Sequence, residues 1–121
     1  MLNAPTDQPP NGTILALVGE FDVGQRERLR EAFERVVDQQ VIVLDLSRTM
    51  YIDSTVLGSL LRLRGKVLER GGALIIAGAT PNVRRLLEMT RLAGLFDIRD
   101  SLVEVQNAEV LRRADIVAVR S

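Results

Sequence analysis

The feature of this sequence that most constrains its fold is an alternation of short apolar runs with segments of helical periodicity. Three runs are continuous and rich in Val, Ile, Leu and Ala, and they cover residues 14–18, 41–46 and 73–77. Such runs are typical of strands that are buried on both faces. Because parallel strands need helical crossovers between them, the alternation predicts an α/β fold with a mixed, mainly parallel β-sheet.

The clearest helix is predicted to begin near Asp22. This aspartate and Gln25 match a capping pattern in which each side chain accepts a hydrogen bond from a backbone amide at the helix start. The segment that follows carries a single apolar stripe, formed by Leu29, Ala32, Phe33, Val36 and Val37. The pattern therefore indicates an amphipathic helix that covers the sheet with one face.

Further helical segments bring the expected total to about four. Residues 57–69 form one, and its apolar circumference is so wide that either a neighbouring helix or a partner protein must cover part of it; we expect the helix. Another begins at Thr80-Pro81, since Thr suits a helix cap and Pro the first helical position. A short strand is expected over residues 95–98. A terminal helix that carries Val110 and Leu111 follows, with Asn107 as its cap.

The beginning of the chain differs in composition from the rest. Pro5, Pro9, Pro10 and Gly12 stand there among polar residues, as in an irregular segment. We therefore expect a flexible lead-in over residues 1–12 and one domain over residues 13–121. A domain of this length buries an adequate core without disulfides or metals.

The composition excludes several classes of function. The chain has no Cys and no His, so it lacks the usual ligands of structural zinc and the commonest general base. Its 16 basic and 16 acidic residues balance, which argues against nucleic acid as a partner. No apolar run approaches the roughly 18 residues of a membrane span, so we expect no membrane insertion and a cytoplasmic location. The composition therefore disfavours an enzyme, although carboxylates could still do acid–base work, and we expect no cofactor and no metal.

One polar cluster stands between the second apolar run and the second helical segment. It contains Asp53, Ser54 and Thr55, residue types that accept hydrogen bonds from the unpaired amides of a helix start. A helix start also favours phosphate, which makes a serine there a plausible phosphorylation site. From the residues alone, a structural cap and a modification site both remain open. A hydrolase is disfavoured, because no orienting His or Lys belongs to the motif.

Five segments together resemble the STAS family. In chain order they are Gly19-Glu20-Phe21-Asp22, Val43-Leu44-Asp45-Leu46, Ile52-Asp53-Ser54-Thr55-Val56-Leu57-Gly58, Gly71-Gly72 and Pro81-Asn82-Val83-Arg84-Arg85-Leu86-Leu87. The resemblance covers about residues 13 to 115 and implies a four-helix α/β fold with a mixed sheet. Regulatory members of the family, the anti-sigma factor antagonists, bind an anti-sigma factor with a GHKL-type serine kinase domain. The kinase phosphorylates the antagonist and releases it, and a serine phosphatase reverses the modification.

The resemblance also implies roles for individual residues. The phosphorylated serine corresponds to Ser54, with Asp22, Asp53 and Thr55 as its neighbours, and Val56, Leu57 and Gly58 belong to the partner surface. The family usually has Gly where this chain has Val56. We expect the Val56 side chain to lie on the surface that meets the kinase. Replacing it with Gly should leave stability about unchanged, because the two residues differ by only a few tenths of a kcal/mol in helix propensity.

The leading hypothesis is therefore an anti-sigma factor antagonist that regulates sigma-factor-dependent transcription. The resemblance to the STAS family also allows two alternative functions. One is a STAS accessory subunit of a lipid-trafficking ABC transporter, and the other is a scaffold component of a stress-signalling assembly. The identity of the bound protein distinguishes the three.

Overall fold

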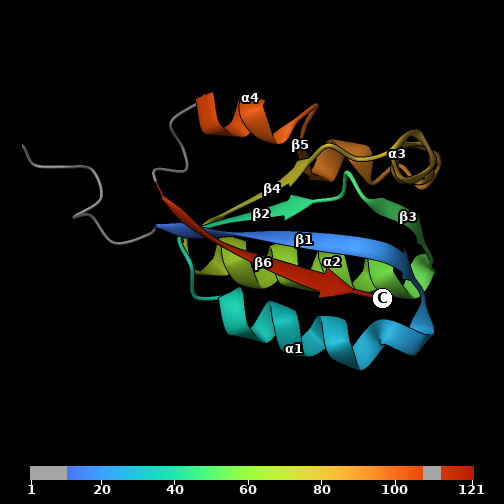
Figure 1. The fold of residues 1–121 in the computed structure, drawn as a ribbon, viewed down its shortest axis with the longest axis horizontal. Helices are drawn as coiled ribbons and strands as arrows, with labels where there is room; N and C mark the ends of the chain where they lie inside the picture. Colours follow the sequence, from blue (N-terminus) through green and yellow to red (C-terminus); the bar gives the residue numbers. More distant parts are fainter. Residues whose placement is uncertain (1–10, 108–112) are drawn as a thin grey trace, which may run out of the picture.

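The alternating pattern of the sequence forms one sheet with helices on both faces (Figure 1). The computed structural model describes residues 11–107 and 113–121. Its strands are β1 Gly12–Phe21, β2 Val41–Asp45, β3 Thr49–Ile52, β4 Ala73–Ala77, β5 Asp97–Arg99 and β6 Ala114–Arg120. Its α-helices are α1 Arg26–Val36, α2 Ser54–Glu69, α3 Pro81–Met89 and α4 Leu102–Asn107, and short 3-10 turns cover Val23–Gln25 and Ala93–Leu95. The predicted α/β class with four helices is confirmed.

The sheet is parallel throughout the described residues. β1 pairs with β2, β3 and β6, β2 pairs with β4, and β4 pairs with β5. β2 and β3 follow one another along β1, since Gly12–Ala16 pair with β2 and Gly19–Phe21 pair with β3. No antiparallel pair of the predicted mixed sheet occurs in residues 11–107 and 113–121, which agrees with the helical crossovers between the strands.

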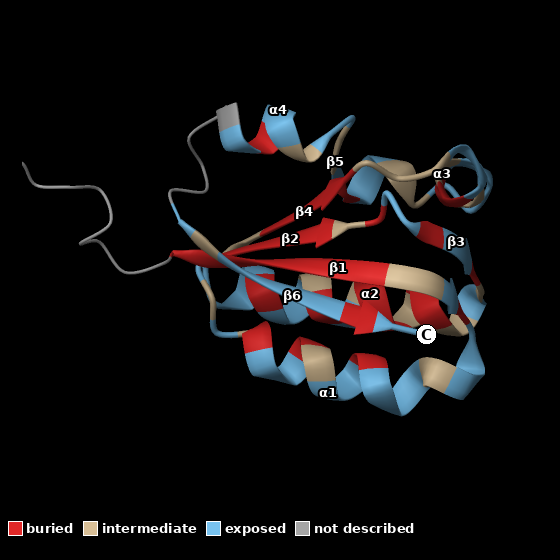
Figure 2. Cartoon of the chain, viewed as in Figure 1, coloured by how far each residue is buried: buried red, intermediate tan, exposed pale blue. Residues whose placement is uncertain are grey.

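The larger part of the core lies between the sheet and helices α1, α2 and α3. Every second strand residue enters it, and these residues are Leu15, Leu17, Ile42, Leu44, Leu74 and Ile76. On α2, Leu60 is completely buried while Leu68 is 49% exposed. Helix α1 lies beside α2 and covers part of its apolar circumference, as expected from the sequence (Figure 2).

The intervening strand residues form a smaller core on the opposite face. Ile14, Val41, Val43, Ile75 and Ala77 meet Val105 of α4 there. Both faces of β1, β2 and β4 are thus buried, which explains why these strands read as continuous apolar runs and not as alternating ones.

A bulge in β1 directs the chain toward the candidate site. The register between β1 and β3 shifts between Gly19 and Glu20, and Gly19 has a φ of +115°. Only glycine adopts that conformation without strain, so the first position of the Gly-Glu-Phe-Asp motif has a structural reason. The completely buried Phe21 then anchors the chain immediately before Asp22.

The prediction of a terminal helix capped by Asn107 is wrong. Asn107 is the last residue of α4, which begins at Leu102. The backbone N–H of Glu104 donates to the Ser101 hydroxyl at 3.2 Å, and the Glu104 carboxylate accepts from the N–H of Asp100 at 3.3 Å. Ser101 and Glu104 therefore fix the helix start upstream of the predicted position. Val110 and Leu111 lie outside the described residues.

Strand β6 has no counterpart among the predicted elements. It lies parallel to β1, with Gly12–Val18 opposite Ala114–Arg120, and forms an edge of the sheet (Figure 1). Val119 is buried in the larger core, and the guanidinium of Arg28 in α1 donates to the carbonyl of Arg120 at 2.6 Å. The C-terminal segment thereby pairs with the hydrogen-bonding edge of β1 that β2 and β3 do not occupy.

Two residues that were assigned to the expected lead-in, Asn11 and Gly12, are described by the structure. Residues 1–10 lie outside the described residues, but Asn11 is 7% exposed and Gly12 is the first residue of β1. The carbonyl of Asn11 accepts from the N–H of Val41, and its N–H donates to the carbonyl of Arg113, both at 3.1 Å. Residues 11 and 12 therefore belong to the folded part of the chain.

Candidate functional site

Asp53 joins the start of α2 to the turn that follows β1. Its Oδ1 accepts from the backbone N–H of Val56 at 3.0 Å and caps the helix. Its Oδ2 accepts from the backbone N–H of Val23 at 3.1 Å. The backbone N–H of Asp53 itself donates to the carbonyl of Phe21 at 3.2 Å. A single carboxylate thus fixes the relative position of two loops that are thirty residues apart.

Asp22 caps the neighbouring turn, as the sequence predicted. Its carboxylate accepts from the N–H of Gly24 at 2.7 Å, and its own N–H donates to the Gln25 side-chain oxygen at 2.9 Å. This capping box opens the 3-10 turn that leads directly into α1. Because Val23 follows Asp22 and donates to Asp53, the structure brings both motif aspartates to one corner of the molecule.

Ser54 is the first residue of α2, and its side chain is exposed. The amides of the first helical turn have no acceptor within the helix, so this end of α2 carries partial positive charge. Thr55 is half-buried, and its carbonyl accepts from the Ser59 hydroxyl at 3.2 Å. Of the two hydroxyl residues, Ser54 is therefore the more accessible to a modifying enzyme.

The prediction that the Val56 side chain lies on the partner surface is wrong. Val56 is 1% exposed and Leu57 is 4% exposed, and both belong to the larger core. At the start of α2, the Ser54 side chain is exposed to solvent and the Val56 side chain is buried in the core. Only Gly58 of the three predicted partner residues is half-exposed. Val56 and Leu57 contribute by packing the helix against the body of the domain.

An apolar hollow of about 360 Å³ lies next to Ser54, between β3, the start of α2 and α3. Its apolar lining is Ile52, Leu57, Val83 and Leu86, and its polar and aromatic lining is Tyr51, Asp53, Ser54, Asn82 and Thr90. We call it the serine hollow. Tyr51, Asn82 and α3 were not predicted from the sequence as parts of a site. The only local signal for Tyr51 is its place directly before the Ile52–Gly58 motif.

Exposed apolar side chains extend the surface around the serine hollow. Tyr51 lines the hollow and is exposed, as is its neighbour Met50 in β3. Val23, whose backbone is bonded to Asp53, is exposed as well. Large apolar side chains that are exposed occur in protein-binding surfaces.

Within residues 11–107 and 113–121, no three acidic side chains come together as ligands for a metal ion. None of the helices in this part of the chain has the length and apolar content needed to cross a membrane.

The chain matches the STAS domain family over residues 3–105. It is a member of the STAS family. It is 34% identical over 85 residues to a STAS-domain containing protein of Pseudomonas aeruginosa, an alignment that covers 69% of this chain and 84% of that protein. It is 30% identical over 101 residues to the anti-sigma-B factor antagonist of Bacillus subtilis, covering 80% of this STAS protein and 90% of the relative.

Solved structures agree with the fold. A sulfate transporter family protein from Wolinella succinogenes superposes with a TM-score of 0.72 at 19% identity, covering 83% of this chain and 85% of that one. A likeness at this identity establishes the arrangement of strands and helices. The STAS fold implied by the sequence motifs is therefore confirmed.

Proposed function

We propose that this STAS protein is an anti-sigma factor antagonist, and that phosphorylation of Ser54 switches its binding to an anti-sigma factor with a GHKL-type serine kinase domain. The observation that carries the proposal is the exposed Ser54 side chain at the first position of α2, directly after the capping Asp53 and at the rim of the serine hollow. The relative from B. subtilis named as an anti-sigma factor antagonist supports it. A serine phosphatase completes the cycle.

The contact surface is the serine hollow with its exposed apolar neighbours. An apolar side chain of the partner enters between Leu57, Val83 and Leu86, and Tyr51 closes the contact from the rim. The neutral Ser54 hydroxyl is small enough to stay within such a contact. Binding, and not catalysis, is the role of this surface, in a protein that works in the cytoplasm.

Phosphate on Ser54 opposes this contact through its charge. It adds roughly −1.5 to −2 charges beside Asp53, whose carboxylate is already engaged with two backbone amides. No Lys or Arg is among the residues that line the serine hollow. Among the described residues that line the hollow, the phosphate therefore finds no cation to replace the hydration that it loses on binding. An unpaired charge buried in an interface costs about 2–5 kcal/mol, which is enough to release the partner.

The proposal is tested by incubating the purified protein with anti-sigma kinases from the same source and Mg-ATP, followed by mapping of the modified residue by mass spectrometry. Phosphate is expected on Ser54. Ser54→Ala should remain unmodified and bind constitutively. Ser54→Asp should bind poorly, with a smaller effect than phosphate because it carries a single charge in a planar group. Thr55→Ala is the matched control and should be phosphorylated and released like the unaltered protein.

Two outcomes contradict this function. Phosphate on Ser54→Ala assigns the modification to another residue. Absence of modification, together with a Ser54→Asp protein that binds as well as the unaltered one, removes the switch. Capture of an ATPase subunit or of a multi-protein stress complex in place of a kinase then favours the accessory subunit or the scaffold.

A further inference from the structure

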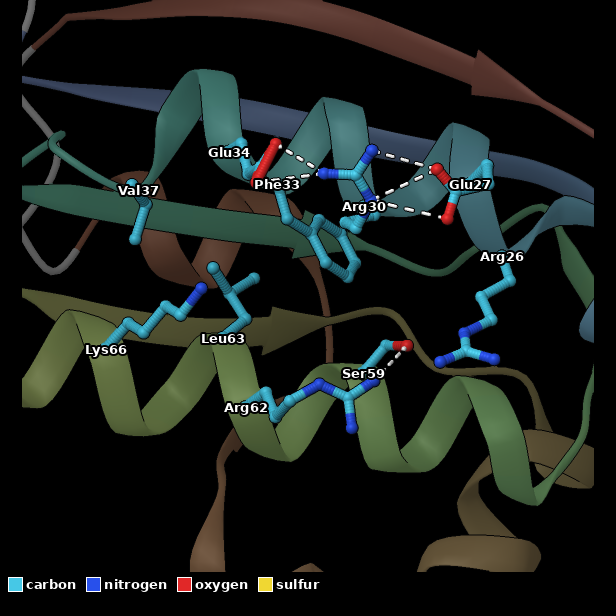
Figure 3. A pocket seen from close by; sticks show the side chains of 10 residues that line it. All are labelled: Arg26, Glu27, Arg30, Phe33, Glu34, Val37, Ser59, Arg62, Leu63 and Lys66. Atoms are coloured by element: carbon cyan, nitrogen blue, oxygen red, sulfur yellow. Dashed lines mark hydrogen bonds and ion pairs between the residues drawn. The ribbon is translucent and has the colours of Figure 1, made fainter.

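A second hollow lies between α1 and α2, away from the serine hollow (Figure 3). Its volume is about 210 Å³, and we call it the interhelical hollow. Phe33 from α1, Val37 directly after α1 and Leu63 from α2 supply its apolar lining. The rest of its lining is polar or charged, and consists of Arg26, Glu27, Arg30, Glu34, Ser59, Arg62 and Lys66. This combination of an apolar wall with converging charges is typical of a ligand pocket.

The two carboxylates of the interhelical hollow share one cation within α1. Arg30 forms ion pairs with Glu27 at 2.8 Å and with Glu34 at 2.9 Å. The hydrogen bond from Arg30 and the attraction of its charge lower the pKa of Glu27, so this carboxylate remains ionised. Arg30 is in turn engaged by both glutamates.

Three cations remain at the interhelical hollow. Across the residues that the structure describes, none of Arg26, Arg62 and Lys66 forms an ion pair. Counted over the whole lining, four cations face two carboxylates, which leaves a surplus of two positive charges. A hollow lined by charge of one sign attracts ligands of the opposite sign.

Two of these cations converge. Figure 3 shows Arg26 reaching down from α1 and Arg62 lying on α2 toward the same end of the hollow, with Ser59 between them. The Arg62 guanidinium donates to the Ser59 hydroxyl at 3.3 Å. Arg26 is attracted by Glu27 without forming an ion pair with it, while Arg62 has no ion-pair partner among the described residues. Two guanidinium groups that approach one another repel, and an anion between them relieves that repulsion.

We propose that the interhelical hollow binds a small amphiphilic anion, with its oxyanion group between Arg26 and Arg62 and its short apolar body against Phe33 and Leu63. Guanidinium groups bind carboxylate and phosphate oxygens through paired, charge-assisted hydrogen bonds, so either head group fits. The hollow is smaller than the roughly 300 Å³ at which pockets for drug-sized ligands begin, which limits the apolar body to a short chain. The site is independent of the phosphorylation proposed for Ser54.

The test is a titration of the full ¹⁵N-labelled chain followed by NMR, with four probes. Hexyl phosphate and hexanoate carry both an anionic group and an apolar chain, whereas inorganic phosphate lacks the chain and 1-hexanol lacks the charge. Saturable shifts are expected at Ser59, Arg62 and Leu63 with at least one of the two amphiphilic anions, and the one that binds more tightly identifies the head group. Inorganic phosphate and 1-hexanol should each bind at least about tenfold more weakly.

Variants assign the binding to this hollow. Arg26→Gln and Arg62→Gln should each weaken binding of the preferred amphiphile by about tenfold. Both side chains are exposed, so the variants should fold as the unaltered protein does. Arg85→Gln, an exposed cation on α3, is the matched control and should bind as before.

The proposal is overturned by any of three results. One is the absence of saturable shifts with both amphiphilic anions up to about 10 mM. Another is binding of 1-hexanol as tight as that of the anions, which would make the charges irrelevant. The third is equal affinity of the unaltered protein, Arg26→Gln and Arg62→Gln.

Discussion

Asp53 gives the sharpest test of how the site is held together. Its two oxygens accept from Val56 at 3.0 Å and from Val23 at 3.1 Å, so one half-buried carboxylate serves the helix and the neighbouring turn. Removal of a helix cap costs about 1 kcal/mol. Loss of the second bond, to a charged acceptor, adds roughly 1.5 kcal/mol. We therefore expect Asp53→Ala to lower the free energy of unfolding by about 2–3 kcal/mol.

Asp53→Asn separates the two bonds. The amide oxygen keeps the bond to Val56, while the amide nitrogen is a donor and cannot accept from Val23, so the loss should be about 1.5 kcal/mol. Urea denaturation with unchanged m-values measures both losses. Asp38→Ala, which breaks an exposed ion pair with Arg70, is the control and should cost less than about 0.5 kcal/mol. Equal losses for Ala and Asn, or a loss below about 0.5 kcal/mol for Asp53→Ala, would refute this reasoning.

Three further predictions concern packing and ionisation. Val56→Gly should lower the free energy of unfolding by about 3 kcal/mol in urea denaturation and not leave it unchanged, because the removed side chain is 1% exposed. Leu60→Ala should cost about 2–5 kcal/mol and Leu68→Ala under about 1 kcal/mol in the same assay, since only the first side chain is buried; similar losses would contradict the assigned core. The pKa of Glu27, followed by carboxyl NMR, should lie below that of an unpaired glutamate and return toward it in Arg30→Gln. Because this pKa is lowered in the folded state, any stabilisation from the pair is present above the unfolded pKa and is lost as pH falls through the folded one.

The local signals of the sequence were sufficient for most of the fold. Asp22 and Gln25 form the expected capping hydrogen bonds, and both residues lie within one short stretch of the chain, so the pattern could be recognised locally. Pro81 is the first residue of α3, as its fixed φ favours. Thr80 stands at the predicted cap position, but its hydroxyl donates to the carbonyl of Thr49 at 3.1 Å and does not cap the helix. The position of such a residue is set locally, whereas its hydrogen-bond partner comes from the tertiary fold.

The features that the sequence did not predict depend on contacts between distant segments. Strand β6 forms because β1 has an open side next to the C-terminal segment, and the β-branched residues Ile116, Val117 and Val119 suit that place. The inward direction of Val56 depends on how α2 lies on the sheet. The serine hollow needs α3 beside β3, and no spacing along the chain indicates that contact.

The candidate site was predicted in part. The residues alone placed Asp53, Ser54 and Thr55 at a helix start, and the structure agrees. That Asp22 and Asp53 lie close together was predicted only from the family resemblance. The contact that links them is a hydrogen bond from Val23, the neighbour of Asp22, to Asp53, thirty residues further along the chain, and no local pattern indicates such a contact. The role of Ser54 as a phosphorylation site remains a proposal.

The central claim, that phosphate on Ser54 releases the partner, is tested most directly by one pair of dissociation constants. Phosphoserine is installed at position 54, and binding of the purified anti-sigma kinase to the modified and unmodified chains is measured by calorimetry. The account predicts at least about 30-fold weaker binding of the phosphorylated chain, which corresponds to the lower limit of about 2 kcal/mol for an unpaired interfacial charge. Equal dissociation constants for the two chains would contradict it.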